Sequence, residues 1–295
     1  MLKYVLFRIA AWVVPALPLQ LTYGLASLAA AVTYQLAAGS RRNVLSNMRR
    51  VLGPHATPAE LERAARGAFY TNACNYVDFF RIPSTSVAAL RSRTEVINAD
   101  AFLEAYRRGK GMVFTSAHFG NMDQSIQIAV DYNVHVWVLA EHTRPEALFQ
   151  FVARQRESHG VRFISIGQRG LREAFHAIRR GEAVAAVADR DIQGHGATVP
   201  FFGEPTSLPA GAVELAARTG APLVPGFCYR LPGGRYRIEF GAEIELDRSG
   251  RDAATVERNL GKVVAVMEQH IRRAPDQWWV MEPIWDRRPA AATEH

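Results

Sequence analysis

The stretch MVFTSAHFGNMD, residues 112–123, decides the fold. Its first half, residues 112–116, is a short apolar run of the kind that forms a buried strand, and Gly120-Asn121 is a turn signal. From Met122 to about residue 132, apolar side chains recur at helical spacing. A buried strand that passes through a short turn into a helix is the repeating unit of an α/β fold.

The same alternation continues along the chain. Further apolar runs of strand type lie at 134–139, 161–166, 183–188 and 223–229. Segments with helical spacing lie between them, at 122–132, 144–158, 168–180 and 209–219. This order predicts an α/β domain with a mostly parallel sheet flanked by helices. Gly233-Gly234 joins residues 223–229 to the run at 236–240, which predicts an antiparallel hairpin at one edge and therefore a mixed sheet.

Two helices are expected outside this alternation. Thr57 and Glu60 form a capping box around Pro58, so a helix should begin there and run to about Phe80. An amphipathic helix is expected over 252–273. The segment from Asp189 to Ser207 shows no clear helix or strand, and a loop of this length inside a compact domain is usually functional.

Composition limits the class of protein. The chain has 295 residues, 48% of them hydrophobic and 21% charged, which excludes a disordered or collagen-like chain. We expect a single domain over residues 41–288, preceded by an apolar segment at 1–40 and followed by a disordered tail at 289–295. Cys74 and Cys228 are the only cysteines, so a disulfide framework or a thiolate zinc site is excluded. The net charge of +7 comes mostly from arginine and favours anionic partners, although a merely basic surface stays open.

The N-terminal segment points to a membrane. No Asp, Glu, Lys or Arg occurs between Arg8 and Arg41, a length that could cross a bilayer as a helix, but Pro15 and Pro18 interrupt it. We therefore expect two short apolar helices, at roughly 4–14 and 19–38, lying in or on a membrane interface with arginines at the headgroups. A hairpin packed on the domain core, a true span and a cleaved signal peptide remain alternatives.

The histidine after the first strand is a candidate general base. His118 follows residues 112–116, and the carboxyl ends of the strands in an α/β sheet face the ligand crevice. Histidine is a natural general base because its ordinary pKa lies near working pH. Asp123 lies five residues on, across the turn, and could accept a hydrogen bond from Nδ1 of His118 and stabilise the imidazolium. Backbone N–H groups at the helix start could hold an anion.

Other chemistries are less complete. Residues 120–123 are similar to a metallophosphoesterase block, but Met122 stands where a histidine ligand is needed. Asp189, Asp191 and His195 could bind a metal, although a turn with solvated carboxylates explains them as well. The G-x-S-x-G elbow of a serine hydrolase is absent.

Five ordered stretches carry a family resemblance. They are NVLSNMRRVLG at 43–53, HFGNMD at 118–123, Asp189-Arg190-Asp191, FFGEPTSLPAG at 201–211 and PDQWWVMEPIW at 275–285. Together with the APLVP run at 221–225, they resemble the glycerolipid acyltransferase superfamily with its H-x4-D motif. Within it, the chain is similar to the lipid A late acyltransferases and, most of all, to the phosphatidylinositol mannoside acyltransferases. Glu204-Pro205-Thr206 and Met281-Glu282-Pro283 favour the second group over lipid A itself.

The resemblance implies an O-acyltransferase of lipid biosynthesis. It implies transfer of a fatty acyl chain from acyl-CoA or acyl-ACP to a hydroxyl of a membrane glycolipid or lysophospholipid. His118 would be the general base and Asp123 would orient it. Glu204 would bind polar groups of the acceptor, Arg190 would lie near substrate phosphates, and Asn121 would brace the turn. A structural ion pair is the alternative for Arg190.

The expected surroundings follow from that chemistry. Because the thioester is already activated, neither a metal nor another cofactor is expected. We expect a monomer on the cytoplasmic face of the plasma membrane, bound to anionic lipid and not to nucleic acid. A hydrolase with the same His–Asp pair and a non-catalytic basic membrane-binding protein remain as alternative functions.

Overall fold

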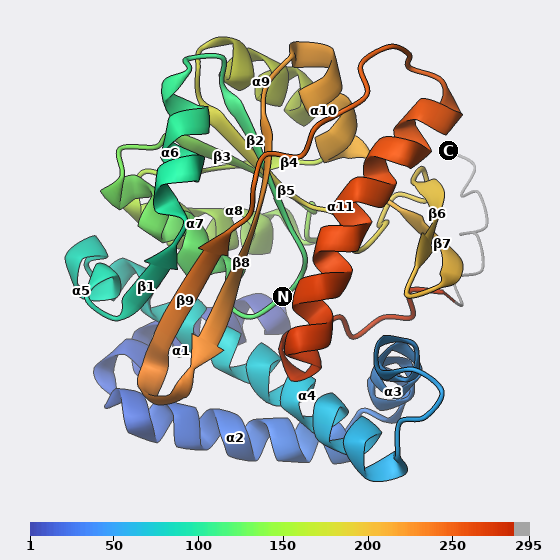
Figure 1. Cartoon of the computed structure of the whole chain (residues 1–295). Helices are drawn as coiled ribbons and strands as arrows, with labels where there is room; N and C mark the ends of the chain where they lie inside the picture. The colour runs from blue at the N-terminus through green and yellow to red at the C-terminus, as the bar shows by residue number, and fades with distance from the viewer. Residues whose placement is uncertain (286–295) are drawn as a thin grey trace.

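A seven-stranded mixed sheet forms the centre of the computed structural model, which describes residues 1–285 (Figure 1). Its strand order is β1-β9-β8-β2-β5-β3-β4. The strands are β1 (Thr94–Ile97), β2 (Met112–Ser116), β3 (Val136–Ala140), β4 (Arg162–Ser165), β5 (Ala183–Val187), β8 (Leu223–Leu231) and β9 (Arg235–Phe240). Only β8 and β9 pair antiparallel, and the other neighbours in this sheet are parallel. The predicted α/β class and mixed, mostly parallel sheet are confirmed.

Helices cover both faces of the sheet. The covering helices are α5 (Val87–Arg91), α6 (Ala99–Arg107), α7 (Met122–Asp131), α8 (Glu146–Arg156), α9 (Gln168–Arg179), α10 (Gly211–Thr219) and α11 (Ala253–Arg273). Side chains alternate along β2, so Val113 enters the core beneath α9, α10 and α11, while Met112 and Phe114 enter the core beneath α6 and α7. The sheet thus separates two apolar cores.

The first four helices of the chain lie together at the lower end of the sheet in Figure 1. They are α1 (Leu2–Ala16), α2 (Leu19–Leu36), α3 (Ala38–Leu52) and α4 (Pro58–Arg81). The capping box predicted for α4 is present, with Thr57 and Glu60 each bonded to the other's backbone N–H. The two predicted apolar helices correspond to α1 and α2, and both pack against α4. Among residues 1–285, no helix combines the length and apolarity needed to cross a bilayer.

The structure corrects the prediction for Asp189 to Ser207. This segment contains β6 (Ala197–Phe201) and most of β7 (Glu204–Leu208), which form a separate antiparallel hairpin. Phe202 and Gly203 make its two-residue turn with φ of 49° and 83°. Such turns usually carry Asn-Gly, so a phenylalanine in the first position hides the signal.

The predicted position of the β8–β9 hairpin at the sheet edge is also wrong. The short strand β1 pairs in parallel outside β9, and β1 is therefore the edge. The predicted tail at 289–295, and the end of the predicted domain at 288, lie outside the described residues.

Candidate active site

His118 lies where β2 ends, and a buried carboxylate from the neighbouring strand holds it. Asp189 follows β5, which pairs in parallel with β2, so the two residues leave the same edge of the sheet. Nδ1 of His118 lies 2.8 Å from Oδ1 of Asp189. Oδ2 of Asp189 accepts the main-chain N–H of His118 and the indole N–H of Trp278, both at 2.8 Å. The arrangement fixes both the backbone and the ring of the histidine.

The ionisation of Asp189 sets the tautomer of His118. Asp189 is fully buried. Burial alone would raise the pKa of its carboxyl, but the charge and hydrogen bonds of His118, together with the Trp278 indole, outweigh burial and lower that pKa. An ionised carboxylate can only accept, so Nδ1 of His118 must carry the proton. Nε2 is then the nitrogen that can accept a proton, as a general base requires.

This geometry corrects the predicted pairing of His118 with Asp123. Asp123 lies in the first turn of α7 and forms a bidentate ion pair with Arg156, at 2.9 Å for both contacts. Arg156 ends α8 and lies over the rings of Phe79 and Phe163. Because α8 supplies this partner, Asp123 faces the opposite wall of the cavity, and the Nδ1 side of His118 faces Asp189.

The turn after His118 needs its glycine. Gly120 has a φ of +51°, and a Cβ there would lie 1.7 Å from the carbonyl oxygen of Cys228. The carbonyl oxygen of Gly120 accepts hydrogen bonds from Asn75 (2.7 Å) and from the Trp279 indole (3.1 Å). Asn121 caps α7 by accepting the N–H of Gln124 at 3.2 Å. The expectation that Asn121 braces the turn fits these contacts.

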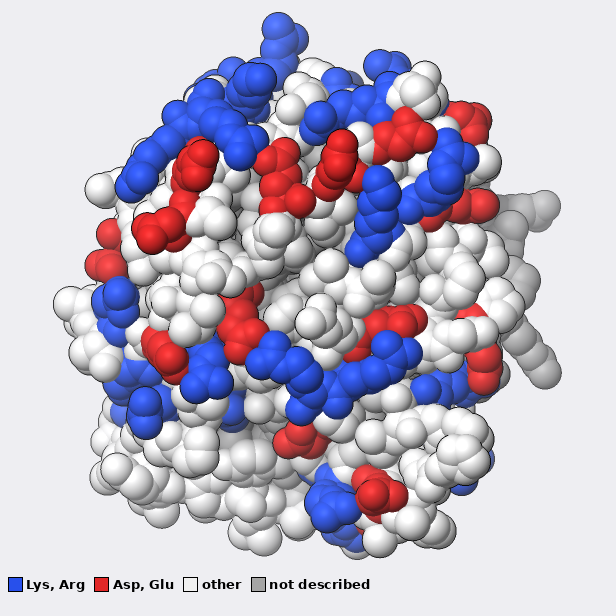
Figure 2. All heavy atoms as spheres, viewed as in Figure 1, with Lys and Arg blue, Asp and Glu red and all other residues white. Residues whose placement is uncertain are grey.

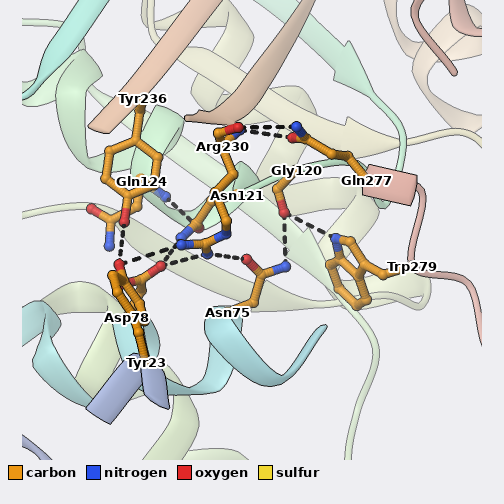
Figure 3. A network of polar contacts seen from close by, with 10 residues as sticks. All are labelled: Tyr23, Asn75, Asp78, Gly120, Asn121, Gln124, Arg230, Tyr236, Gln277 and Trp279. Atoms are coloured by element: carbon orange, nitrogen blue, oxygen red, sulfur yellow. Dashed lines mark hydrogen bonds and ion pairs between the residues drawn. The ribbon is translucent and has the colours of Figure 1, made fainter. Parts of the chain in front are cut away.

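A buried ion pair supports this turn from below (Figure 3). Asp78 of α4 pairs with Arg230 of β8 at 2.5 Å, and both side chains are at most 8% exposed. Asp78 also accepts from the amide of Asn121 and from the hydroxyl of Tyr23, each at 2.7 Å. Helices α2 and α4 are thereby tied to the backbone that carries His118.

A cavity of about 310 Å³ opens beside the histidine. His118, Asn121, Asp123, Arg190 and Trp279 line it together with apolar side chains. The apolar lining consists of Phe7, Tyr76, Phe79, Phe114, Met122, Ile126, Val138, Leu139, Ala140, Leu148, Val152, Phe163, Ile166, Ala185, Ala186, Val187 and Ile192. The lining is mostly apolar and carries polar side chains that include the proton-accepting imidazole and the Asp123–Arg156 pair, which suits an apolar substrate with a reactive polar group.

Two other predicted site residues differ in their relation to the cavity. Arg190 lines it and forms ion pairs with Glu141 and Glu282, each at 2.7 Å. Glu204 begins β7, pairs with Arg50 at 2.7 Å and is not among the lining residues. The structure therefore brings four of the five predicted site residues to one cavity and leaves Glu204 outside it.

The carboxylates considered as metal ligands have other partners. Asp189 holds His118, and Asp191 accepts the N–H groups of Gly194 and Gly196 and the hydroxyl of Ser207. Within residues 1–285, no cluster of three or more His, Cys, Asp or Glu side chains could hold a metal ion.

The sequence prediction missed Asp189 as the partner of His118, and it missed Trp278. A signal for Asp189 exists, because it directly follows the apolar run at 183–188. Trp278 gives no such signal, since it reaches the site from the far C-terminal end of the described chain.

Comparisons with known proteins show the family of the chain. A sequence model of the family described as bacterial lipid A biosynthesis acyltransferase matches residues 1–287. The chain is 29% identical over 286 residues to a phosphatidylinositol mannoside acyltransferase of Mycolicibacterium smegmatis, covering 94% of this chain and 89% of that protein. It is 30% identical over 257 residues to a phosphatidylinositol mannoside acyltransferase of Mycobacterium tuberculosis, covering 84% of this chain and 78% of that protein. The chain therefore belongs to the bacterial lipid A biosynthesis acyltransferase family and is an acyltransferase.

Proposed function

We propose that this acyltransferase moves a fatty acyl chain from acyl-CoA or acyl-ACP to a hydroxyl of a membrane glycolipid, with phosphatidylinositol mannosides as the first candidates. The observation that carries the proposal is the His118–Asp189 pair at a mostly apolar cavity. The relatives named above supply the acceptor class. A lysophospholipid is the second acceptor class.

The reaction needs only proton transfer and positioning. Nε2 of His118 takes the proton of the acceptor hydroxyl as its oxygen attacks the thioester carbonyl carbon. The C–S bond then breaks, the ester forms, and the thiolate leaves with the proton that His118 returns. Asp189 stabilises the imidazolium between these steps, because its carboxylate stays ionised beside Nδ1. No metal or redox cofactor is needed.

The remaining predicted residues have supporting roles in this proposal. Asp123 shapes one wall of the cavity through its ion pair with Arg156. Its effect on the reaction is therefore indirect, through the shape of that wall. Arg190, with two carboxylate partners, exchanges one of them for a phosphate of donor or acceptor. Asn121 fixes the turn behind His118. Glu204 contacts the acceptor headgroup only where that headgroup extends beyond the cavity.

We also propose that α1 and α2 rest on the membrane. Leu6, Ile9 and Trp12 of α1, and Leu28 and Leu36 of α2, are 54–82% exposed. In Figure 2 the surface over α2, at lower left, is almost free of charged side chains, and a band of basic side chains interspersed with acidic ones lies above it. Apolar side chains below basic ones match the order of acyl chains and anionic headgroups. Both proposed thioester donors are cytoplasmic, so the enzyme acts on the cytoplasmic face of the membrane. It acts there as a peripheral protein and, in this proposal, as a monomer.

His118→Ala tests the proposed base. With an acyl-CoA donor and phosphatidylinositol mannoside in mixed micelles, we expect product formation to fall about 10²–10⁴-fold while thermal stability is kept. Near-normal transfer by the folded variant would remove His118 from the chemistry. Free fatty acid as the only product of the wild-type enzyme, with every acceptor lipid offered, would favour the hydrolase alternative.

A further inference from the structure

The floor of the active-site cavity includes one aromatic ring, that of Phe114. Phe114, Ser116 and His118 occupy alternate positions on and just after β2 and line the same cavity. At about 3.3 Å per residue, Phe114 lies about 7 Å deeper along the strand than Ser116, and His118 lies beyond the end of the strand. Its neighbours in register are Ala185 on β5 and, beyond it, Val138 on β3, and both also line the cavity.

A second, smaller cavity continues below that floor. It measures about 20 Å³, room for roughly one water-sized group. It is lined by Met112, Ala183 and Val136, which occupy the next layer of the same three strands. The residues shared by the two cavities are Phe114, Ser125 and Ile126. Both cavities thus lie between one face of the sheet and α7, with this three-residue wall between them.

Phe114 is held rigidly in the wall. Its ring packs edge-on against Phe102 and Phe240, with centroids 6.3 and 5.9 Å away. Gly226 on β8 makes room for the ring, since a Cβ there would lie 2.5 Å from one edge carbon of Phe114. A ring boxed in on these sides cannot swing aside to admit a longer chain.

We propose that Phe114 sets the maximum length of the acyl chain that the enzyme accepts, with Ala185, beside it on β5, setting the width at that depth. The inference rests on the proposed function, because it takes the apolar cavity as the acyl site. A chain whose thioester lies at His118 extends along β2 under α7 until its terminal methyl meets the Phe114 ring. Longer chains must leave part of their length outside the cavity.

The test measures binding apart from turnover. In the His118→Ala background, isothermal titration calorimetry is run with saturated acyl-CoAs of even chain length from octanoyl to eicosanoyl. Each methylene that enters the cavity should raise the affinity for acyl-CoA about fourfold. Once the acyl chain fills the cavity, further methylenes should leave the affinity unchanged. Adding Phe114→Ala should increase the chain length at which the affinity levels off by about two carbons or more. The space left by the ring would join the smaller cavity and admit a longer chain.

Two further variants sharpen the test. Ala185→Val, which adds volume at the depth of Phe114 and opens no void, should move the levelling to a shorter chain. Phe69→Ala removes an equally buried ring on α4 that borders neither cavity, and it should leave the levelling unchanged. An unchanged length limit in both Phe114→Ala and Ala185→Val overturns the proposal. If Phe114→Ala does not fold, an unchanged limit in Ala185→Val alone overturns it.

Failure of the proposed function has a different signature. If the enzyme with His118 intact transfers no acyl group to phosphatidylinositol mannoside, the proposed acceptor reaction fails even where the acyl-CoA series binds with a length limit. If neither the acyl-CoA series nor acyl-ACPs of the same chain lengths bind the folded protein, the length-setting role of Phe114 is refuted.

Discussion

Replacing Asp189 with asparagine tests the tautomer that the structure assigns to His118. Oδ2 of Asp189 accepts two hydrogen bonds from fixed donors, the main-chain N–H of His118 and the indole N–H of Trp278. An asparagine has one carbonyl oxygen and one NH₂ group. The oxygen must face the two fixed donors, so the NH₂ group faces Nδ1 of His118.

That orientation reverses the imidazole. The NH₂ group can only donate, so Nδ1 must accept and the ring proton must move to Nε2. A ring with its proton on Nε2 cannot take a proton from the acceptor. The same Asp-to-Asn change in the serine protease triad lowers kcat about 10⁴-fold, and we expect a loss of about 10³–10⁴-fold here. The fold should persist, because the volume is unchanged and the two fixed donors keep their acceptor.

The assay is release of free CoA with acceptor present, followed with a thiol reagent, alongside thermal denaturation. Asp191→Asn is the matched control, because this nearby carboxylate holds Gly194, Gly196 and Ser207 and does not touch His118. The double variant His118→Ala with Asp189→Asn should be no slower than His118→Ala alone, since both act on one group. A kcat within about tenfold of wild type in folded Asp189→Asn would refute the tautomer argument.

Four other outcomes are expected. Asp123→Asn breaks the bidentate pair with Arg156, so thermal denaturation should show a loss of about 1–2 kcal/mol, with a much smaller loss of kcat than in Asp189→Asn. Asp78→Ala leaves a buried guanidinium without its counter-charge, so urea titration should show a loss of about 3–5 kcal/mol in unfolding free energy. Trp12→Glu should weaken sedimentation with anionic vesicles about tenfold or more without changing stability. Burial lowers the pKa of His270 from 6.5 to about 4. The unfolded chain therefore takes up this proton first as pH falls, so stability should decline from about pH 6.5 to pH 4, and His270→Leu should flatten that decline in denaturant titrations at each pH.

The central strands were predictable because burial on both faces leaves a plain apolar signal. The run at 112–116 coincides with β2, and the run at 183–188 exceeds β5 by one residue. The edge strand β1 has the sequence TEVI and buries only Thr94, so its pattern does not separate it from a loop. β6 and β7 escaped prediction because each contains a proline, Pro200 opposite Pro205, and because their turn begins with a phenylalanine.

The site was predictable in place but not in pairing. The rule that functional residues gather at the carboxyl ends of parallel strands puts His118 and Asp189 at one edge. Spacing along the chain favours Asp123, five residues from His118, over Asp189, which is 71 residues away. Strand order decides between them, since β2 and β5 are neighbours only because the chain crosses over through β3 and β4. A single sequence indicates which segments form strands but not the order of those strands in the sheet.

The N-terminal helices contact the candidate active site as well as being candidates for membrane contact. Tyr23 of α2 bonds to Asp78, which bonds to Asn121 beside His118, and Phe7 of α1 lines the cavity. Deleting residues 1–40 therefore removes a cavity wall and a support of the catalytic turn together with the exposed apolar face. A loss of activity in such a deletion would not report on membrane binding. Charge placed on the outward face of α1 separates the two effects, because that face touches neither the cavity nor the buried ion pair. Because Phe7 of α1 lines the cavity, an acceptor lipid would have a short path to His118 if, as proposed, α1 and α2 rest on the bilayer.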